Sequence, residues 1–155
     1  MHNYLKISLL FMAALALQVT LFPAYLLDPF RPNLLIIFVV FMGFRTSLQR
    51  GASFSFLIGL LHDSVSGLYL GLHAFSYLLI FFVLNRFAHR FYTDNSFLII
   101  LGVLGGTLVN GLASLILLSI FSTSIGSYSF FLGSLLPQAL TNALIASLFF
   151  NFFPL

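Results

Sequence analysis

Three ionisable side chains, His62, Asp63 and His73, lie near one another in the sequence and have the atoms for proton transfer or metal binding. Asp63 is one of three acids in the 155 residues, and it follows the apolar run 54–61. A carboxylate in a membrane span costs about 2.5 to 3.5 kcal/mol, so it normally faces a partner, a cavity or a functional group. The role of Asp63 therefore depends on whether it lies in a span.

No specific catalytic motif accompanies these residues. The chain has four histidines and no cysteine, and it contains none of the patterns H-E-x-x-H, G-x-S-x-G or G-x-x-x-x-G-K. The spacing of His62, Asp63 and His73 matches no defined set of metal ligands, so a structural pairing is favoured over a metal site. We therefore expect a protein that is not an enzyme, with no catalytic residues, metal or cofactor.

The composition indicates an integral membrane protein. Hydrophobic residues make up 61% of the chain and charged residues 6%, and the mean hydropathy is +1.12. A soluble domain carries about 25% charged residues, because its surface must face water. The apolar runs are continuous and do not alternate, which favours helices over a barrel. We expect a single all-α domain over residues 1–155, surrounded by membrane lipids and with no nucleic-acid partner.

The apolar runs predict six transmembrane helices. They cover residues 5–22, 34–44, 51–66, 72–84, 97–121 and 130–153. The second run is about 16 Å long against about 30 Å of hydrocarbon. It must extend through Arg31 and Arg45 by snorkelling, be re-entrant, or be a short helix buried behind the others, which is the alternative we favour. The first run resembles a signal peptide, but it continues to residue 22, which argues against cleavage.

The basic residues predict the orientation. With the N-terminus in the cytoplasm, five of the six basic residues fall on the cytoplasmic side, as the positive-inside rule requires. Both termini are then cytoplasmic, and Asp63, His62, His73 and Arg31 form an intramembrane polar cluster toward the outer face. We predict that Asp63 pairs there with His73 or Arg31.

In the third and fifth spans, small and polar residues recur every four positions, which places them on one helix face, and the sixth span offers further polar residues. They are Gly51, Ser55, Gly59, Asp63 and Gly67 in the third span, Gly102, Gly106 and Asn110 in the fifth, and Gln138, Thr141 and Asn142 in the sixth. We expect these spans to share a polar interior in which the glycines, with Asn110, serve helix packing. The alternative is a ligand pocket lined by Gln138, Thr141 and Asn142.

Three segments carry a family resemblance. They are RPNLL at residues 31–35, GLLHD at 59–63 followed by Gly67, and LGLHAFSY at 70–77. In this order, and with the length and six-span layout, they resemble the central part of the MreD family of bacterial rod shape-determining membrane proteins. Many relatives carry an acid after the proline, where this chain has Asn33.

The resemblance implies a non-enzymatic scaffold of the bacterial cell-elongation complex in the inner membrane, supporting peptidoglycan synthesis and cell shape. The expected partner is MreC and, through it, MreB and the RodA–transpeptidase synthase. The expected fold is similar to the S-component of energy-coupling-factor (ECF) transporters. The alternative is therefore a small-molecule or lipid-binding subunit resembling such a component, although the first span lacks the Ala-x-x-x-Ala face by which S-components bind their partner.

Overall fold

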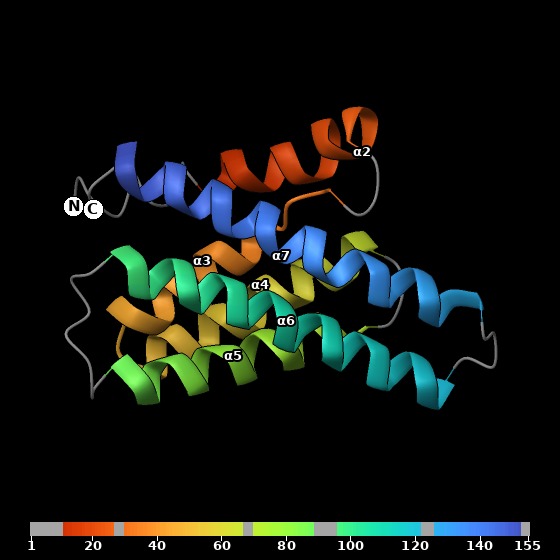
Figure 1. Ribbon diagram of the computed structural model, residues 1–155. Coiled ribbons are helices and arrows are strands. Elements are labelled where there is room, and N and C mark those ends of the chain that lie inside the picture. Colours follow the sequence, from red (N-terminus) through yellow and green to blue (C-terminus); the bar gives the residue numbers. More distant parts are fainter. Residues whose placement is uncertain (1–10, 27–29, 67–69, 89–95, 122–125, 153–155) are drawn as a thin grey trace.

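The computed structural model describes residues 11–26, 30–66, 70–88, 96–121 and 126–152, and these residues form six helices and no strand (Figure 1). The first helix is Phe11–Tyr25, which includes a π-helical turn, η1 (Leu17–Leu21), and ends in α2 (Phe22–Tyr25). The others are α3 (Leu34–Arg45), α4 (Leu48–Ser66), α5 (Leu72–Ala88), α6 (Ser96–Phe121) and α7 (Gly126–Phe152). The prediction of an all-α protein is confirmed.

The observed helices extend beyond several predicted runs. α4 begins three residues earlier than predicted, at Leu48, and α5 continues four residues further, to Ala88. The added turns contain polar residues such as Gln49 and Asn85, which continue the backbone hydrogen bonding after the apolar pattern has ended. α7 runs through Pro137 without a break. Neighbouring groups in a membrane helix can satisfy the backbone groups that a proline leaves unpaired.

The helices differ greatly in length. α6 and α7 contain apolar stretches of 20 and 18 residues, Phe97–Ile116 and Leu132–Phe149, which are long enough to cross a membrane. The first helix, α3 and α5 are apolar but shorter. α3 has 12 residues and is therefore about 18 Å long.

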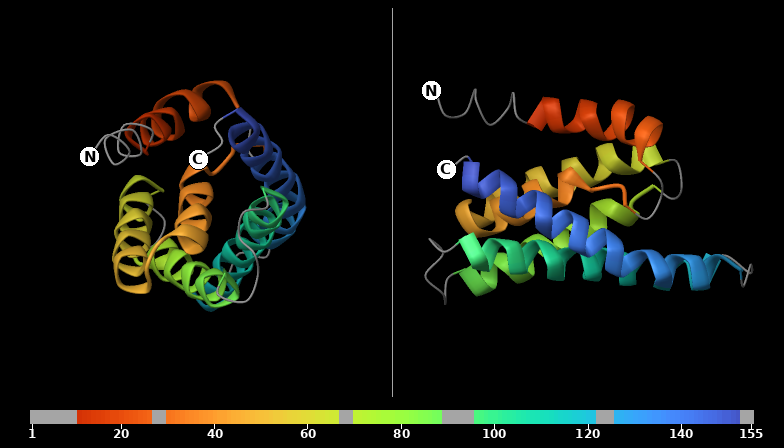
Figure 2. Two further views of the ribbon diagram at one scale, coloured as in Figure 1. Left: turned by 90° about the vertical axis from the view of Figure 1, so that its left-hand side faces the viewer. Right: turned by 45° about the horizontal axis from the view of Figure 1, so that its top comes forward.

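α3 lies at the centre of the bundle. The end-on view in Figure 2 shows it enclosed by the other five helices, and side chains on every side of it are buried, such as Leu35, Ile36, Ile37 and Val39. A helix that is apolar all round is expected in such a position. The prediction of a short second helix buried behind the others is confirmed.

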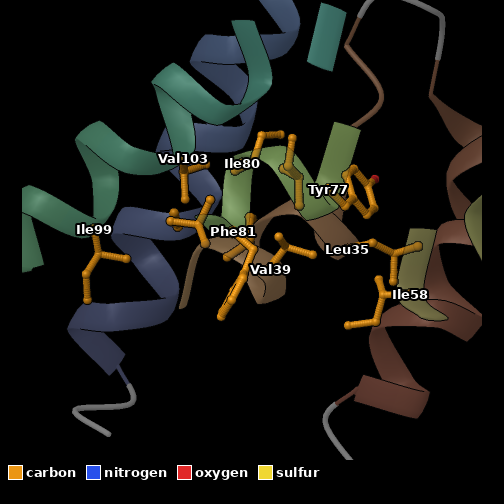
Figure 3. Packing of buried hydrophobic residues seen from close by; sticks show 12 residues of the cluster. Leu35, Val39, Ile58, Tyr77, Ile80, Phe81, Ile99 and Val103 are labelled. Atoms are coloured by element: carbon orange, nitrogen blue, oxygen red, sulfur yellow. The ribbon is translucent and has the colours of Figure 1, made fainter. Parts of the chain in front are cut away.

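Side chains from several helices build the core around α3. Figure 3 shows Val39 of α3 together with Phe81 of α5 and Val103 of α6, all of which are fully buried. The hydroxyl group of Tyr77 lies at one edge of this cluster, where the apolar core meets a group of polar side chains. The core therefore fixes the positions of the helices that carry the polar site.

Two glycines of α6 allow α6 to approach α3 and α5 closely. A Cβ atom at Gly102 would lie 2.9 Å from a ring carbon of Phe44 and 3.1 Å from Val40. At Gly106, a Cβ atom would lie 3.3 Å from both Ile80 and Val40. These separations are shorter than ordinary van der Waals contacts, so both glycines act in helix packing.

Candidate functional site

Asp63 caps the start of α5. Its carboxylate accepts hydrogen bonds from Gly71 N at 2.8 Å, His73 N at 2.9 Å and Ala74 N at 3.2 Å, and the residue is 1% exposed. The first N–H groups of a helix have no partner within that helix, and a negative charge is stabilised by the positive end of the helix dipole. The carboxylate of α4 thus supplies what the buried start of α5 lacks.

Two glycines make this geometry possible. Gly59 lies one turn before Asp63, and a Cβ atom there would lie 2.6 Å from Ala74 N and 2.7 Å from His73 O. Gly71 has a φ of +99°, a conformation that residues with a side chain rarely adopt. The close approach of α4 to α5 and the sharp turn between them bring the N–H groups within reach of Asp63.

His73 is also a side-chain partner of Asp63. Its Nδ1 lies 2.9 Å from Asp63 Oδ1, so among the described residues the carboxylate has four hydrogen-bond donors, three from the backbone and one from this ring. The rings of His73 and His62 are in contact, with centroids 4.0 Å apart and an angle of 44° between their planes. His73 is one of the two partners predicted for Asp63.

Arg31, the other predicted partner, is not among those four donors. Its Nε donates to Leu26 O at 2.9 Å and its Nη2 to Pro23 O at 3.3 Å. These carbonyl groups belong to the end of the first helix, where a basic side chain is favoured by the helix dipole. Arg31 therefore fixes the end of the first helix beside the start of α3.

Tyr77 connects the histidines to α3. Its hydroxyl oxygen lies 2.7 Å from His62 Nδ1 and accepts a hydrogen bond from Asn33 Nδ2 at 2.7 Å. Tyr77 is four residues after His73, so the two side chains lie on one face of α5. The hydroxyl group thereby joins α3, α4 and α5.

Neutral amides satisfy the buried start of α3. Asn33 N donates to Asn142 Oδ1 at 2.7 Å, Leu35 N to Gln18 Oε1 at 3.3 Å and Ile36 N to Asn33 Oδ1 at 3.3 Å. Asn33 is therefore the N-cap of α3, and side chains of the first helix and α7 complete the cap. No carboxylate takes part in these three bonds.

The network ends on α6 and α7. Asn142 Nδ2 donates to Thr107 Oγ1 at 3.0 Å, and that hydroxyl group donates to Val103 O at 2.8 Å. Thr141, which was predicted to line a pocket, instead donates to Pro137 O of its own helix. The hydrogen bonds and the contact of the two histidine rings thus connect Asp63 to Thr107 through α3, α4, α5, α6 and α7.

The prediction of one polar interior shared by α4, α6 and α7 is wrong for the stripe of α4. This stripe faces α5: Gly51 lies against Phe81, and Gly59 against Ala74. The connection between α4 and α5 is short, which makes the two helices antiparallel neighbours. Gly67, at the end of the predicted stripe, lies outside the described residues.

A cavity of about 570 Å³ lies beside this network. The residues that line it include Gln18, Arg31, Asn33, His62, His73, Asn110, Ser114, Ser134 and Gln138, with apolar residues between them. Gln138 and Asn110 thus face the same space from α7 and α6, whereas Asn110 was predicted to serve helix packing. Among the described residues, no three His, Asp or Glu side chains are arranged to bind a metal ion.

Several network residues were absent from the predicted site. They are Gln18, Asn33, Tyr77 and Thr107. Asn33 could have been found, because an asparagine directly before an apolar helix is a common N-cap. Gln18 is an amide in an apolar run, which signals a buried hydrogen bond, but its partners are distant in the sequence.

Tyr77→Phe is expected to lower the free energy of unfolding by about 1 to 3 kcal/mol, because Asn33 and His62 lose a buried hydrogen-bond partner. Tyr25→Phe is a matched control, since Tyr25 is 82% exposed. Thermal stability in detergent, followed by the loss of the monodisperse peak in size-exclusion chromatography, measures both. Equal stability of the two variants would contradict a structural role for the hydroxyl group of Tyr77.

Comparison with known families agrees with the motif. The family described as rod shape-determining protein MreD matches residues 2–155, which is nearly the whole chain. No curated protein and no solved structure gives a match. The resemblance that the three sequence segments indicated is confirmed.

Proposed function

This chain belongs to the MreD family of rod shape-determining proteins, and we propose that it is a non-enzymatic scaffold subunit of the bacterial cell-elongation complex. The family match over nearly the whole chain carries this proposal. The geometry of the site is consistent with it, because the carboxylate of Asp63 is engaged by four hydrogen bonds that hold two helices together. Asp63 therefore has a structural task that accounts for its burial.

We further propose that all six helices cross the inner membrane with both termini in the cytoplasm. The start of the first helix and the end of α7 lie at one end of the bundle in Figure 1. Arg45, Arg50 and Arg86 belong to that same end, since they lie at the end of α3, the start of α4 and the end of α5. The positive-inside rule supports a cytoplasmic position for this end. The cavity and Asp63 then face the periplasmic side.

The proposed direct partner is MreC, which would link the chain to MreB and the RodA–transpeptidase synthase. We assign its contact surface to the turn between α4 and α5 and the neighbouring Arg31 segment. Leu70 in this turn is 82% exposed, and Asp63 holds the turn in place through Gly71. Similarity to the S-component fold stays a prediction.

A single-cysteine variant tests both the partner and the orientation, because the chain contains no cysteine. We expect Leu70→Cys in spheroplasts to react with a membrane-impermeant maleimide and to form a crosslink to MreC. Arg50→Cys, at the opposite end, is the control and should react only after the membrane is permeabilised. Both variants should maintain rod shape in cells depleted of the native chain.

Two outcomes would contradict this assignment. Labelling of Arg50→Cys but not Leu70→Cys in intact spheroplasts would reverse the orientation. If none of the single-cysteine variants at positions 68 to 72 forms a crosslink to MreC, this turn is not part of the partner surface.

A further inference from the structure

One residue that lines the cavity beside the polar network has a buried side-chain oxygen without a hydrogen-bond partner. Asn110 of α6 lines this cavity and is 8% exposed, and its Oδ1 has no partner. A buried polar atom left unpaired costs about 1 to 3 kcal/mol, so native proteins usually supply a partner or bind one. Because Oδ1 is an acceptor, a molecule with a hydroxyl or N–H group would satisfy it.

The position of Asn110 distinguishes it from the other unpaired buried groups. Ser55 Oγ and Ser76 Oγ also have no partner, but neither residue lines the cavity. Ser55 belongs to the stripe of α4 that packs against α5, and Ser76 is 1% exposed. Asn110 therefore combines an unpaired buried atom with an adjacent cavity, into which a rotation of its side-chain amide would turn Oδ1.

The cavity has the size and the lining of a ligand site. Its volume of about 570 Å³ falls within the range of small-molecule sites, about 300 to 1,000 Å³. Polar side chains face it from several helices: Gln138 from α7, Ser114 from α6 and His62 from α4. The first helix adds mainly apolar side chains, namely Leu15, Val19 and Phe22. A ligand that fits this lining has a hydrogen-bonding part and an apolar part.

The charges of the lining restrict the ligand further. None of the described residues that line the cavity is an acid, whereas Arg31 is one of them. Asp63 is turned toward the start of α5, whose N–H groups donate hydrogen bonds to its carboxylate. The start of α3, capped by neutral amides, directs the positive end of its dipole to the same region. An uncharged or anionic ligand is favoured over a cation.

The first helix covers the cavity with an unusual segment. Gln18 and Val19 line the cavity and belong to the π-helical turn η1, a type of turn that is frequent at functional sites. The Gln18 amide donates to Asn33 Oδ1 at 3.3 Å and accepts from Leu35 N at 3.3 Å. The π-helical turn thus presents one polar side chain to the network while apolar neighbours face the cavity.

We propose that this cavity is a binding site for an uncharged or anionic amphiphile that carries a hydroxyl or N–H group. The polar part binds Asn110 and Gln138, and the apolar part lies along the first helix. A phospholipid with a glycerol headgroup and a free hydroxylated solute with an apolar portion share this chemistry. This site is additional to the scaffold function and does not depend on it.

Native mass spectrometry of the full chain, extracted from membranes with mild detergent, tests the proposal. The wild type should retain a molecule whose occupancy falls about tenfold in Asn110→Leu, the effect expected for losing one good hydrogen bond. Ser76→Ala is the matched control, because it also removes an unpaired buried group but lies away from the cavity, and it should retain the molecule. Gln138→Leu provides a second test if Asn110→Leu does not fold.

Two added probes identify the source. Dihexanoyl-phosphatidylglycerol carries both parts of the proposed ligand, and glycerol 1-phosphate carries the headgroup alone. Thermal stabilisation by the first probe alone assigns the site to a lipid, whereas an acyl-free retained molecule assigns it to a free solute. Equal occupancy in the wild type, Asn110→Leu and Gln138→Leu, or no retained molecule together with no stabilisation by either probe, would overturn the proposal.

Discussion

Gly59→Ala is expected to lower the free energy of unfolding by about 1 to 3 kcal/mol, the usual cost of an added methyl group in a well-packed core. The new Cβ atom would press against the backbone of α5, at Ala74 N and His73 O. Backbone atoms cannot rotate away as the end of a side chain can, so α4 and α5 must separate. That separation would also lengthen the hydrogen bonds from His73 N and Ala74 N to Asp63.

Gly105→Ala is the matched control for this prediction. Gly105 lies in α6, and a Cβ atom there would meet nothing within 4 Å. The substitution should be neutral or stabilise the helix by up to about 1 kcal/mol, because alanine has the higher helix propensity. Heating followed by size-exclusion chromatography compares the two variants in detergent. A Gly59→Ala protein as stable as Gly105→Ala would show that the close contact of α4 and α5 is not needed.

Asp63→Ala is expected to have a larger effect, a loss of about 3 kcal/mol or more, since each buried N–H group left unpaired costs about 1 to 3 kcal/mol. Three N–H groups at the start of α5 and the ring of His73 lose their acceptor together. Water can replace the carboxylate only where it reaches the site, and the site is buried. We expect little folded protein to be recovered from membranes.

Asp63→Asn separates the hydrogen bonds from the charge. The amide keeps one acceptor oxygen but places an NH₂ group against a donor, so its stability should lie between those of the wild type and Asp63→Ala. Ser64→Ala is the neighbouring control, because Ser64 is exposed and donates to Leu60 O of its own helix. Wild-type stability of Asp63→Ala would rule out the capping role.

The buried starts of α3 and α5 are capped by different groups. α3 and α5 both begin among buried residues, so their first N–H groups need hydrogen-bond partners from the protein. α5 receives a carboxylate from α4, whereas α3 receives the amides of Gln18, Asn33 and Asn142. The one carboxylate is thus placed where a histidine ring donates a hydrogen bond to it and a helix dipole stabilises it, whereas neutral amides cap the helix that begins beside the cavity.

Much of the fold could be predicted, because membrane helices are long apolar runs and their limits fall near Pro, Gly and charged residues. The predicted ends of α4 and α5 were too short, since hydropathy ends before backbone hydrogen bonding does. The pairing of Asp63 with a residue of the next helix could also be predicted, because the short hairpin limits the partners within reach. The three backbone donors to Asp63 could not be predicted from residue types, since every residue except proline carries a backbone N–H group.

The all-α class, the six helices, the MreD family and the burial of the short α3 could be predicted without coordinates. These properties follow from composition, local periodicity and motif order, which require no knowledge of which helices touch. In contrast, helix packing was needed to show that the stripe of α4 faces α5, that Arg31 caps the first helix, and that Gln18, Asn33, Tyr77 and Asn142 meet. Such contacts join residues as far apart as 109 positions, and their partners depend on helix packing that no local pattern specifies.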